Sequence, residues 1–220
     1  MKSINILAGG PTAVLPADFS DFLTADADWI GVDAGSYYLL TKGVTSLTAI
    51  GDFDSLTADQ LAFVKAHVDT DHFQQAKPEK DFTDTELALQ RVLSHFDISE
   101  YQTINLFGMT GGRLDHELDN LLNIFQERYV SLLPKIRLFD AGNIVAFYHA
   151  GDYVISDLYR KKYLGFAALN GIQHFSIADA KYELHDFSSD KACVFASNEF
   201  IEGQDVKISF AAGDVIAIYS

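Results

Sequence analysis

The stretch Thr103-Ile104-Asn105-Leu106-Phe107-Gly108-Met109-Thr110-Gly111-Gly112-Arg113-Leu114-Asp115-His116 decides the fold class of this 220-residue chain. Its first five residues are largely apolar and predict a short strand. A glycine-rich turn then leads into a segment of helical period that starts near Leu114. Parallel sheets are built from units in which a strand leads into a helix in this way, so the stretch predicts an α/β fold.

Four further apolar runs predict strands of the same sheet, each followed by glycine or aspartate: residues 4–8, 29–32, 47–50 and 136–139. Helices are predicted between them, one starting at Thr57 and one at Asp81 or Thr83. The second helix is expected to bury a stripe formed by Leu89, Val92, Leu93 and Phe96. Ligands of open α/β sheets bind beyond the carboxyl ends of the strands, so the polar residues that follow the strands are expected to converge on one crevice.

The pattern changes after about Asn143, where helical period largely disappears. Seven short β-type runs follow, at residues 144–148, 153–155, 165–169, 175–177, 192–196, 206–210 and 215–219. The pairs Gly151-Asp152, Asn170-Gly171 and Gly213-Asp214 predict turns between them. We therefore expect an α/β domain over residues 1–142 and an antiparallel, all-β sandwich or barrel over residues 143–220.

The charge balance narrows the class of partner. Acidic residues outnumber basic residues by 31 to 16, so the formal net charge is −15 at pH 7. Such a field repels nucleic acids and anionic membranes, and we expect neither as a partner. A nucleotide would have to enter against this charge, and a divalent cation would offset the repulsion.

Composition and cysteine usage favour a globular cytoplasmic protein. Hydrophobic residues make up 48% of the chain, which disfavours a disordered or fibrous protein. Cys193 is the single cysteine, so there is no intrachain disulfide framework. The first apolar stretch is too short for a signal peptide, and no run approaches the ~20 apolar residues of a membrane span.

The motif Gly51-Asp52-Phe53-Asp54-Ser55 follows the predicted strand at residues 47–50. Two carboxylates separated by one residue point the same way if the backbone stays extended, and Mg²⁺ takes such hard oxygen ligands. Aspartates are also common turn and cap residues, so this motif is weak evidence when taken alone.

A second acidic motif is the charged loop at residues 77–86. Asp81 and Asp84 are three residues apart in the first helical turn, and Lys80 lies just outside it. A purely structural role is equally consistent, because Thr83 and Glu86 have the spacing of a capping box.

The glycine-rich turn at residues 108–113 can offer backbone N–H groups and a helix N-terminus to a phosphate, and Arg113 adds a fork of donors. His116 on its own is more often a structural histidine than a base or a ligand. Asp33 and the pair Gly9-Gly10 follow two other predicted strands. Together these strand ends predict a site for a nucleotide with Mg²⁺.

In series, these motifs resemble the thiamine pyrophosphokinase family. The resemblance is carried by Asp33, Gly51-Asp52-Phe53-Asp54-Ser55, Lys80-Asp81-Phe82-Thr83-Asp84, Gly111-Gly112-Arg113-Leu114-Asp115-His116 and Ser197-Asn198-Glu199-Phe200. It implies an α/β nucleotide domain followed by a β-sandwich that binds thiamine and forms a homodimer. It also implies transfer of a pyrophosphoryl group from ATP to the thiamine hydroxyl, yielding thiamine diphosphate and AMP.

The resemblance also implies roles for individual residues. The Mg²⁺ ligands implied are Asp52, Asp54 and Asp84, and Arg113 and Asp115 complete the catalytic set. The residues implied to bind the nucleotide are Asp33, Lys80, Asp81, Thr83, Gly111, Gly112, Arg113 and His116. Ser197 and Asn198 are implied to meet thiamine at the subunit interface. Asp84 and Asp115 are both open as the group that orients or deprotonates the alcohol.

Two other functions are compatible with parts of the pattern. One is a kinase or pyrophosphokinase of another small alcohol, which would share the nucleotide half and differ in the second domain. The other is a non-catalytic nucleotide or thiamine sensor. The sensor is disfavoured, because it would not need the complete set formed by Asp52, Asp54, Asp84, Arg113 and Asp115.

Overall fold

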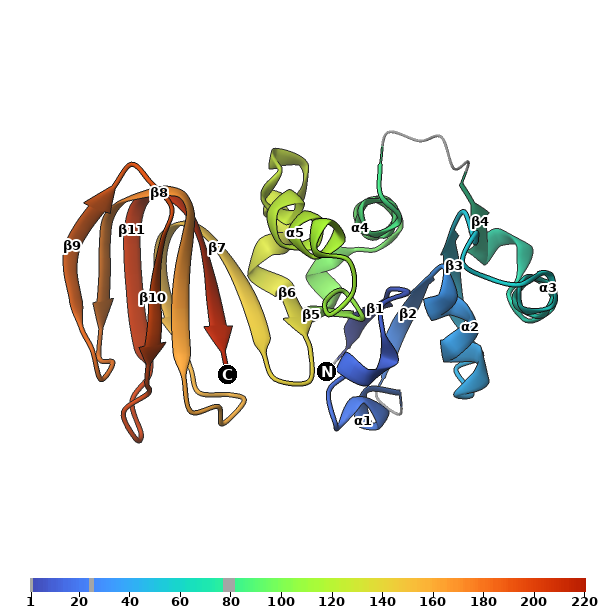
Figure 1. Ribbon diagram of the computed structural model, residues 1–220, viewed down its shortest axis with the longest axis horizontal. Coiled ribbons are helices and arrows are strands. Elements are labelled where there is room, and N and C mark those ends of the chain that lie inside the picture. Colours follow the sequence, from blue (N-terminus) through green and yellow to red (C-terminus); the bar gives the residue numbers. More distant parts are fainter. Residues whose placement is uncertain (1, 24–25, 77–81) are drawn as a thin grey trace. The chain divides into compact units, whose positions relative to one another are not determined.

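The computed structural model describes residues 2–23, 26–76 and 82–220, which form two compact units (Figure 1). Unit 1 comprises Met1–Ile124 and Lys135–Ala141, and unit 2 comprises Phe125–Pro134 and Gly142–Ser220. Unit 2 thus includes a short excursion of the chain before the last strand of unit 1.

Unit 1 contains a parallel sheet with the strand order β6-β5-β1-β2-β3-β4. The strands are β1 (Ser3–Leu7), β2 (Ala27–Val32), β3 (Leu47–Gly51), β4 (Phe73–Gln75), β5 (Thr103–Phe107) and β6 (Ile136–Phe139). All five predicted strands are present, and β1 is buried along its whole length. The edge strand β4 was not predicted, because three residues with exposed glutamines show no apolar run.

The helices of unit 1 are α1 (Phe19–Leu23), α2 (Ala34–Thr41), α3 (Ala58–His67), α4 (Asp84–His95) and α5 (Leu114–Leu122). Three starts agree with the sequence: α3 and α4 follow Thr57 and Thr83, and α5 begins at Leu114. Helices α1 and α2 were not predicted. Thr57 and Thr83 close capping boxes with Gln60 and Glu86. In the predicted stripe of α4, Leu89 and Val92 are buried but Leu93 is 36% exposed. Leu93 was therefore wrongly placed, since it lies 100° beyond Val92 at the edge of the buried face.

Short 3₁₀ segments connect these elements: Thr12–Val14, Thr70–His72, Ile98–Glu100, Asn123–Phe125 and Glu127–Lys135. Within the described part of the chain, no helix has both the length and the apolar character needed to cross a membrane.

Unit 2 is antiparallel, with the strand order β10-β8-β11-β7 and β9 paired with β8. The strands are β7 (Ile144–Ile155), β8 (Leu164–Ala178), β9 (Leu184–Ser189), β10 (Cys193–Asn198) and β11 (Val206–Tyr219). The predicted fold class, an α/β parallel-sheet domain followed by antiparallel β structure, is confirmed. Strand β9 was missed because its sequence, Leu-His-Asp-Phe-Ser-Ser, is mostly polar.

The three predicted turns in unit 2 are wrong, because each lies inside a continuous strand. Gly151, Gly171 and Gly213 have φ values of 157°, 92° and 107° and bend β7, β8 and β11 without reversing them. The ladder between β11 and β7 shifts register between Phe210 and Asp214. A Cβ atom on Gly213 would lie 2.4 Å from the Gly171 carbonyl oxygen, so glycine serves close strand approach here.

Candidate active site

The candidate site lies where the strand order of unit 1 reverses. The chain passes from β1 to β2 on one side, and it later returns with β5 on the other side. Two glycine turns meet there: the Gly10 N–H donates to the Gly108 carbonyl over 3.0 Å, and a Cβ atom on Gly10 would lie 2.2 Å from that oxygen. Glycine is needed at Gly10 because the two turns approach each other this closely, and ligands of open α/β sheets bind at such a switch point.

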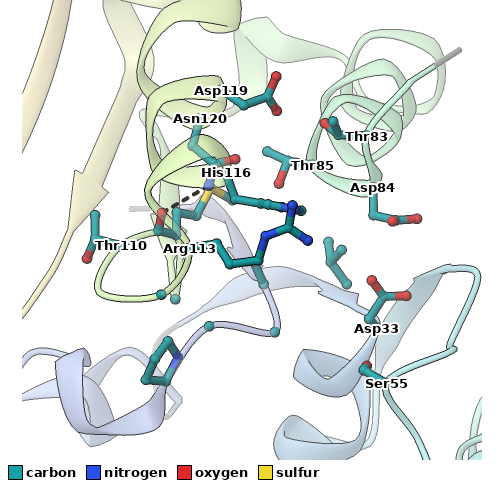
Figure 2. A pocket seen from close by; sticks show the side chains of 18 residues that line it. Asp33, Ser55, Thr83, Asp84, Thr85, Thr110, Arg113, His116, Asp119 and Asn120 are labelled. Atoms are coloured by element: carbon teal, nitrogen blue, oxygen red, sulfur yellow. Dashed lines mark hydrogen bonds between the residues drawn. The ribbon is translucent and has the colours of Figure 1, made fainter.

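A cavity of about 470 Å³ opens at this point (Figure 2). Six of the residues predicted to bind or act on the nucleotide line it: Asp33, Thr83, Asp84, Gly112, Arg113 and His116. They come from the ends of β2 and β5 and from the N-termini of α4 and α5. The predicted convergence of strand ends on one crevice is present.

Three half-buried carboxylates cluster beside the cavity. Asp33, Asp52 and Asp84 each place one carboxylate oxygen within 4.8 Å of the other two. Figure 2 shows Asp33 and Asp84 with their carboxylates close together. Hard oxygen donors gathered at this spacing suit Mg²⁺, so the three side chains form a candidate metal centre.

Asp33 is held in this cluster by an unusual backbone. It precedes α2 with φ 47° and ψ −120°, and its Oδ1 accepts a hydrogen bond from the Phe53 N–H over 3.0 Å. A Cβ atom on Gly51 would lie 1.9 Å from this Oδ1, so Gly51 leaves the space that the carboxylate fills. Left-handed backbone of a residue other than glycine costs free energy, and such residues concentrate at functional sites.

Asp54 lies apart from the cluster. The intervening Phe53 has φ 61° and is buried, so the backbone between Asp52 and Asp54 is not extended. The Asp54 side chain is exposed, and its N–H donates to Asp52 Oδ1 over 3.1 Å. Asp33, which the resemblance implied as a nucleotide contact, occupies the place next to Asp52 and Asp84.

Arg113 and Asp115 form a two-pronged ion pair at the start of α5. Arg113 Nε donates to Asp115 Oδ1 over 3.1 Å, and Nη2 donates to Oδ2 over 2.6 Å. The His116 N–H also donates to Asp115 Oδ1. The hydrogen bond from Arg113 lowers the pKa of Asp115 and raises that of Arg113. Asp115 thus orients Arg113, whose side chain extends over the cavity in Figure 2.

The remaining predicted nucleotide contacts are Thr83, Gly111, Lys80 and Asp81. The Thr83 hydroxyl accepts from the Glu86 N–H and so caps α4 at the cavity wall. The N–H of Gly111 donates to Glu117 Oε2 over 3.1 Å. Lys80 and Asp81 lie outside the described residues.

Comparison with known proteins identifies the family. Residues 19–133 match the family model "Thiamin pyrophosphokinase, catalytic domain", and residues 152–215 match "Thiamin pyrophosphokinase, vitamin B1 binding domain". The chain belongs to the thiamin pyrophosphokinase family. The family membership and thiamine pyrophosphokinase function predicted from the motifs are confirmed.

Relatives of the family match over nearly their full lengths. A thiamine pyrophosphokinase of Bacillus subtilis (strain 168) is 35% identical over 100% of this chain and 99% of its own. The crystal structure of a thiamin pyrophosphokinase family protein from Enterococcus faecalis has a TM-score of 0.88 at 34% identity, covering 99% of this chain and 98% of that one. The crystal structure of the Bacillus subtilis enzyme has a TM-score of 0.83 at 33% identity, with the same coverage.

The two residues implied to meet thiamine lie within the part of the chain that matches the family's vitamin B1 binding domain, at the end of β10. Ser197 is exposed and has φ 61°. Asn198 is 4% exposed, and its Oδ1 accepts from the N–H groups of Tyr182 and Glu199 over 3.0 and 2.9 Å. Its Nδ2 donates to the Tyr182 carbonyl over 2.8 Å. The Asn198 amide therefore holds the backbone, and Ser197 is the exposed neighbour.

Gly9 and Gly10, predicted to follow a strand at the site, line the cavity. Sequence reasoning assigned no role to six other lining residues: Ser55, Thr85, Met109, Thr110, Asp119 and Asn120. The sequence spacing could have predicted that Asn120 belongs to the site. Arg113, His116 and Asn120 are separated by three and four residues, so they share one side of a helix that starts near Leu114.

Proposed function

We propose that ATP and Mg²⁺ bind at the strand ends of unit 1, and that the pyrophosphoryl group is transferred to the hydroxyl of thiamine to give thiamine diphosphate and AMP. The observation that carries this proposal is the convergence of Asp33, Asp52 and Asp84 with Arg113 around a glycine-lined cavity. Phosphoryl transfer needs mainly positioning and charge neutralisation, and this arrangement is suited to both.

The donor set fits Mg²⁺, because three carboxylates from separate parts of unit 1 supply oxygen ligands close together. Asp33, Asp52 and Asp84 would hold the cation, and Asp54 stays a predicted contributor from the same loop as Asp52. The cation would supply neutralisation of charge on the phosphate oxygens.

The chain's own residues bind and orient the reactants. Arg113 donates to phosphate oxygens, and Gly112, Thr83 and His116 border the same space. Gly111, Lys80 and Asp81 stay predicted nucleotide contacts. These groups hold the phosphate chain in one orientation for an in-line attack.

In the transfer, a bond forms between the thiamine hydroxyl oxygen and the β-phosphorus of ATP. The bond from that phosphorus to the oxygen bridging the α- and β-phosphates breaks, and its electron pair leaves with AMP. The hydroxyl proton passes to a carboxylate. Asp84 and Asp115 both stay candidates for this carboxylate: Asp84 lines the cavity, and Asp115 binds Arg113, whose side chain also lines it.

We also propose a homodimer that works in the cytoplasm, with thiamine bound at the subunit interface by residues that include Ser197 and Asn198. An apolar stripe on α5 supports a subunit contact: Leu114, Leu118 and Leu122 are all exposed, Leu114 by 69%. Sedimentation velocity should show a dimer that Leu118→Arg shifts toward monomer. The unpaired Cys193 agrees with a reducing compartment.

The reaction is tested by incubating purified protein with thiamine, ATP and Mg²⁺ and separating the products. We expect AMP and thiamine diphosphate in equal amounts, and no product when thiamine, ATP or Mg²⁺ is omitted. ADP with thiamine monophosphate would retain the nucleotide site and overturn the pyrophosphoryl transfer. Binding of ATP and thiamine without turnover would favour a sensor.

A further inference from the structure

Two side chains of helix α5, Glu117 and Asn120, form hydrogen bonds with the turn that precedes the helix. Asn120 Nδ2 donates to the Met109 carbonyl over 2.9 Å, which is the dashed line in Figure 2. Glu117 Oε2 accepts from the Gly111 N–H over 3.1 Å. The two side chains are three residues apart and therefore project from neighbouring positions of the helix.

The contact of Asn120 is buried. Asn120 is 8% exposed and Met109 is 4% exposed. Burying a side-chain amide is costly unless it forms hydrogen bonds, and the Asn120 amide donates to the backbone of the turn rather than to its own helix. The bond therefore holds the turn at Met109 in a fixed place relative to α5.

The contact of Glu117 is made to a residue of the turn whose conformation favours glycine. Gly111 has φ 73°, and a Cβ atom on it would lie 2.5 Å from the Val14 side chain. The bond between its N–H and the half-buried Glu117 carboxylate holds the left-handed conformation of Gly111, which directly precedes Gly112 and Arg113. Both of these following residues line the cavity.

We propose that Glu117 and Asn120 are positioning residues for nucleotide binding. Together they hold residues 109–111 in the conformation that presents Gly112 and Arg113 to the phosphates. A turn that is already ordered loses less conformational entropy when the ligand binds. The two side chains therefore raise the affinity for ATP by ordering the turn, and this effect needs no direct contact with ATP. The inference rests on the proposed function, since it takes the cavity as the ATP site.

Comparing Asn120 with Glu117 distinguishes positioning of the turn from direct contact with ATP. Asn120 lines the cavity, so a loss of affinity after its substitution could reflect a lost contact. Glu117 is not among the described residues that line the cavity, so its substitution removes no lining side chain. If the turn is what matters, substitution of either residue must act in the same direction.

The test is calorimetric titration of ATP in Mg²⁺ buffer without thiamine, applied to the full chain. We expect Kd to rise about tenfold in Asn120→Ala and about fivefold in Glu117→Ala, the effect of losing one hydrogen bond. Glu117→Gln keeps an acceptor oxygen and should stay within about twofold of wild type. Glu127→Ala, which removes an exposed carboxylate elsewhere, is the matched control.

Steady-state kinetics supplies the second readout. In both alanine variants the KM for ATP should rise in proportion to Kd, while the KM for thiamine stays within about twofold. If Asn120→Ala does not fold, Glu117→Ala and its rescue by glutamine carry the test alone.

Three results would overturn the proposal. Wild-type ATP affinity in a folded Glu117→Ala variant would show that the turn needs no such support. A lowered melting temperature with unchanged Kd in the alanine variants would make the contacts structural only. Absence of ATP binding to wild-type protein would remove the nucleotide site itself, and so the failure would belong to the proposed function.

Discussion

The strand ends of unit 1 and the end of β10 in unit 2 both carry polar residues that stand out in the sequence, but the two regions use them differently. In unit 1, Asp33, Asp52 and Asp84 direct carboxylate oxygens toward one another. In unit 2, the Asn198 amide forms three hydrogen bonds with the backbone of Tyr182 and Glu199.

The difference follows from what the backbone needs in each place. The parallel strands of unit 1 satisfy their backbone groups in the sheet, and polar side chains on the loops that follow such strands commonly serve a ligand. Tyr182 lies between β8 and β9, and Glu199 follows β10, so both are outside the strands. Their backbone groups need partners other than a strand ladder, and a buried asparagine supplies both a donor and an acceptor. A polar residue in a family motif can therefore be a ligand contact or a structural support.

The largest effect is expected from the carboxylate cluster. Asp33→Asn and Asp84→Asn should each lower turnover by about a hundredfold or more, because each removes a charge from the site that neutralises the phosphates. Turnover against Mg²⁺ concentration, with circular dichroism to verify the fold, measures this. Asp54→Asn is the matched comparison. A loss as large as that of Asp33→Asn would bring Asp54 into the centre, whereas unchanged turnover would remove it.

A second prediction concerns the structural role of Asn198. Asn198→Ala should lower the free energy of unfolding by about 2 kcal/mol, because three part-buried hydrogen bonds to the backbone of Tyr182 and Glu199 are lost. Urea denaturation followed by fluorescence measures the change. If Asn198→Ala unfolds like wild type and only the KM for thiamine rises, Asn198 acts as a ligand contact and the contrast between the two regions disappears.

The neighbouring Ser197 should respond in the opposite sense. Ser197→Gly should raise the free energy of unfolding by up to about 1 kcal/mol, because glycine adopts a φ of 61° without strain. The same variant should raise the KM for thiamine if the hydroxyl contacts the substrate. Ser197→Ala, which retains the strain, separates the two effects: its KM should rise without any gain in stability.

The smallest effect is expected at the exposed pair of Arg113 and Asp115. Arg113 lowers the pKa of Asp115, so the pair is complete above the usual aspartate pKa of about 3.9 and is lost as the pH falls through the lowered value. Titration of the Asp115 carboxyl carbon by NMR should give a midpoint below 3.9 that returns toward it in Arg113→Gln. Both groups are largely exposed, so neither stability nor the pair should change between pH 5 and 8. An unshifted midpoint in wild type would show that Asp115 does not hold Arg113.

Much of unit 1 could be predicted because its signals are local. Capping boxes at Thr57 and Thr83 mark helix starts, and the apolar runs before Gly51 and Gly108 mark strand ends. Unit 2 was harder, because a glycine pair that commonly reverses a chain can also bend a strand. At Gly213 the outcome depended on the close approach of Gly171, a residue of another strand.

The order of α/β and β structure, the family, and the motifs from which the site is built can all be read from the chain alone, because apolar period, caps and motif spacing are properties of neighbouring residues. Tertiary structure decided which members of those motifs meet. Asp52 and Asp54 are separated by one residue, yet the left-handed backbone of the buried Phe53 parts them. Asp33 and Asp84 come from distant segments and join Asp52, because sheet pairing brings the ends of β2 and β3 together and α4 starts beside them. Distances across a sheet depend on packing, and no local pattern records them.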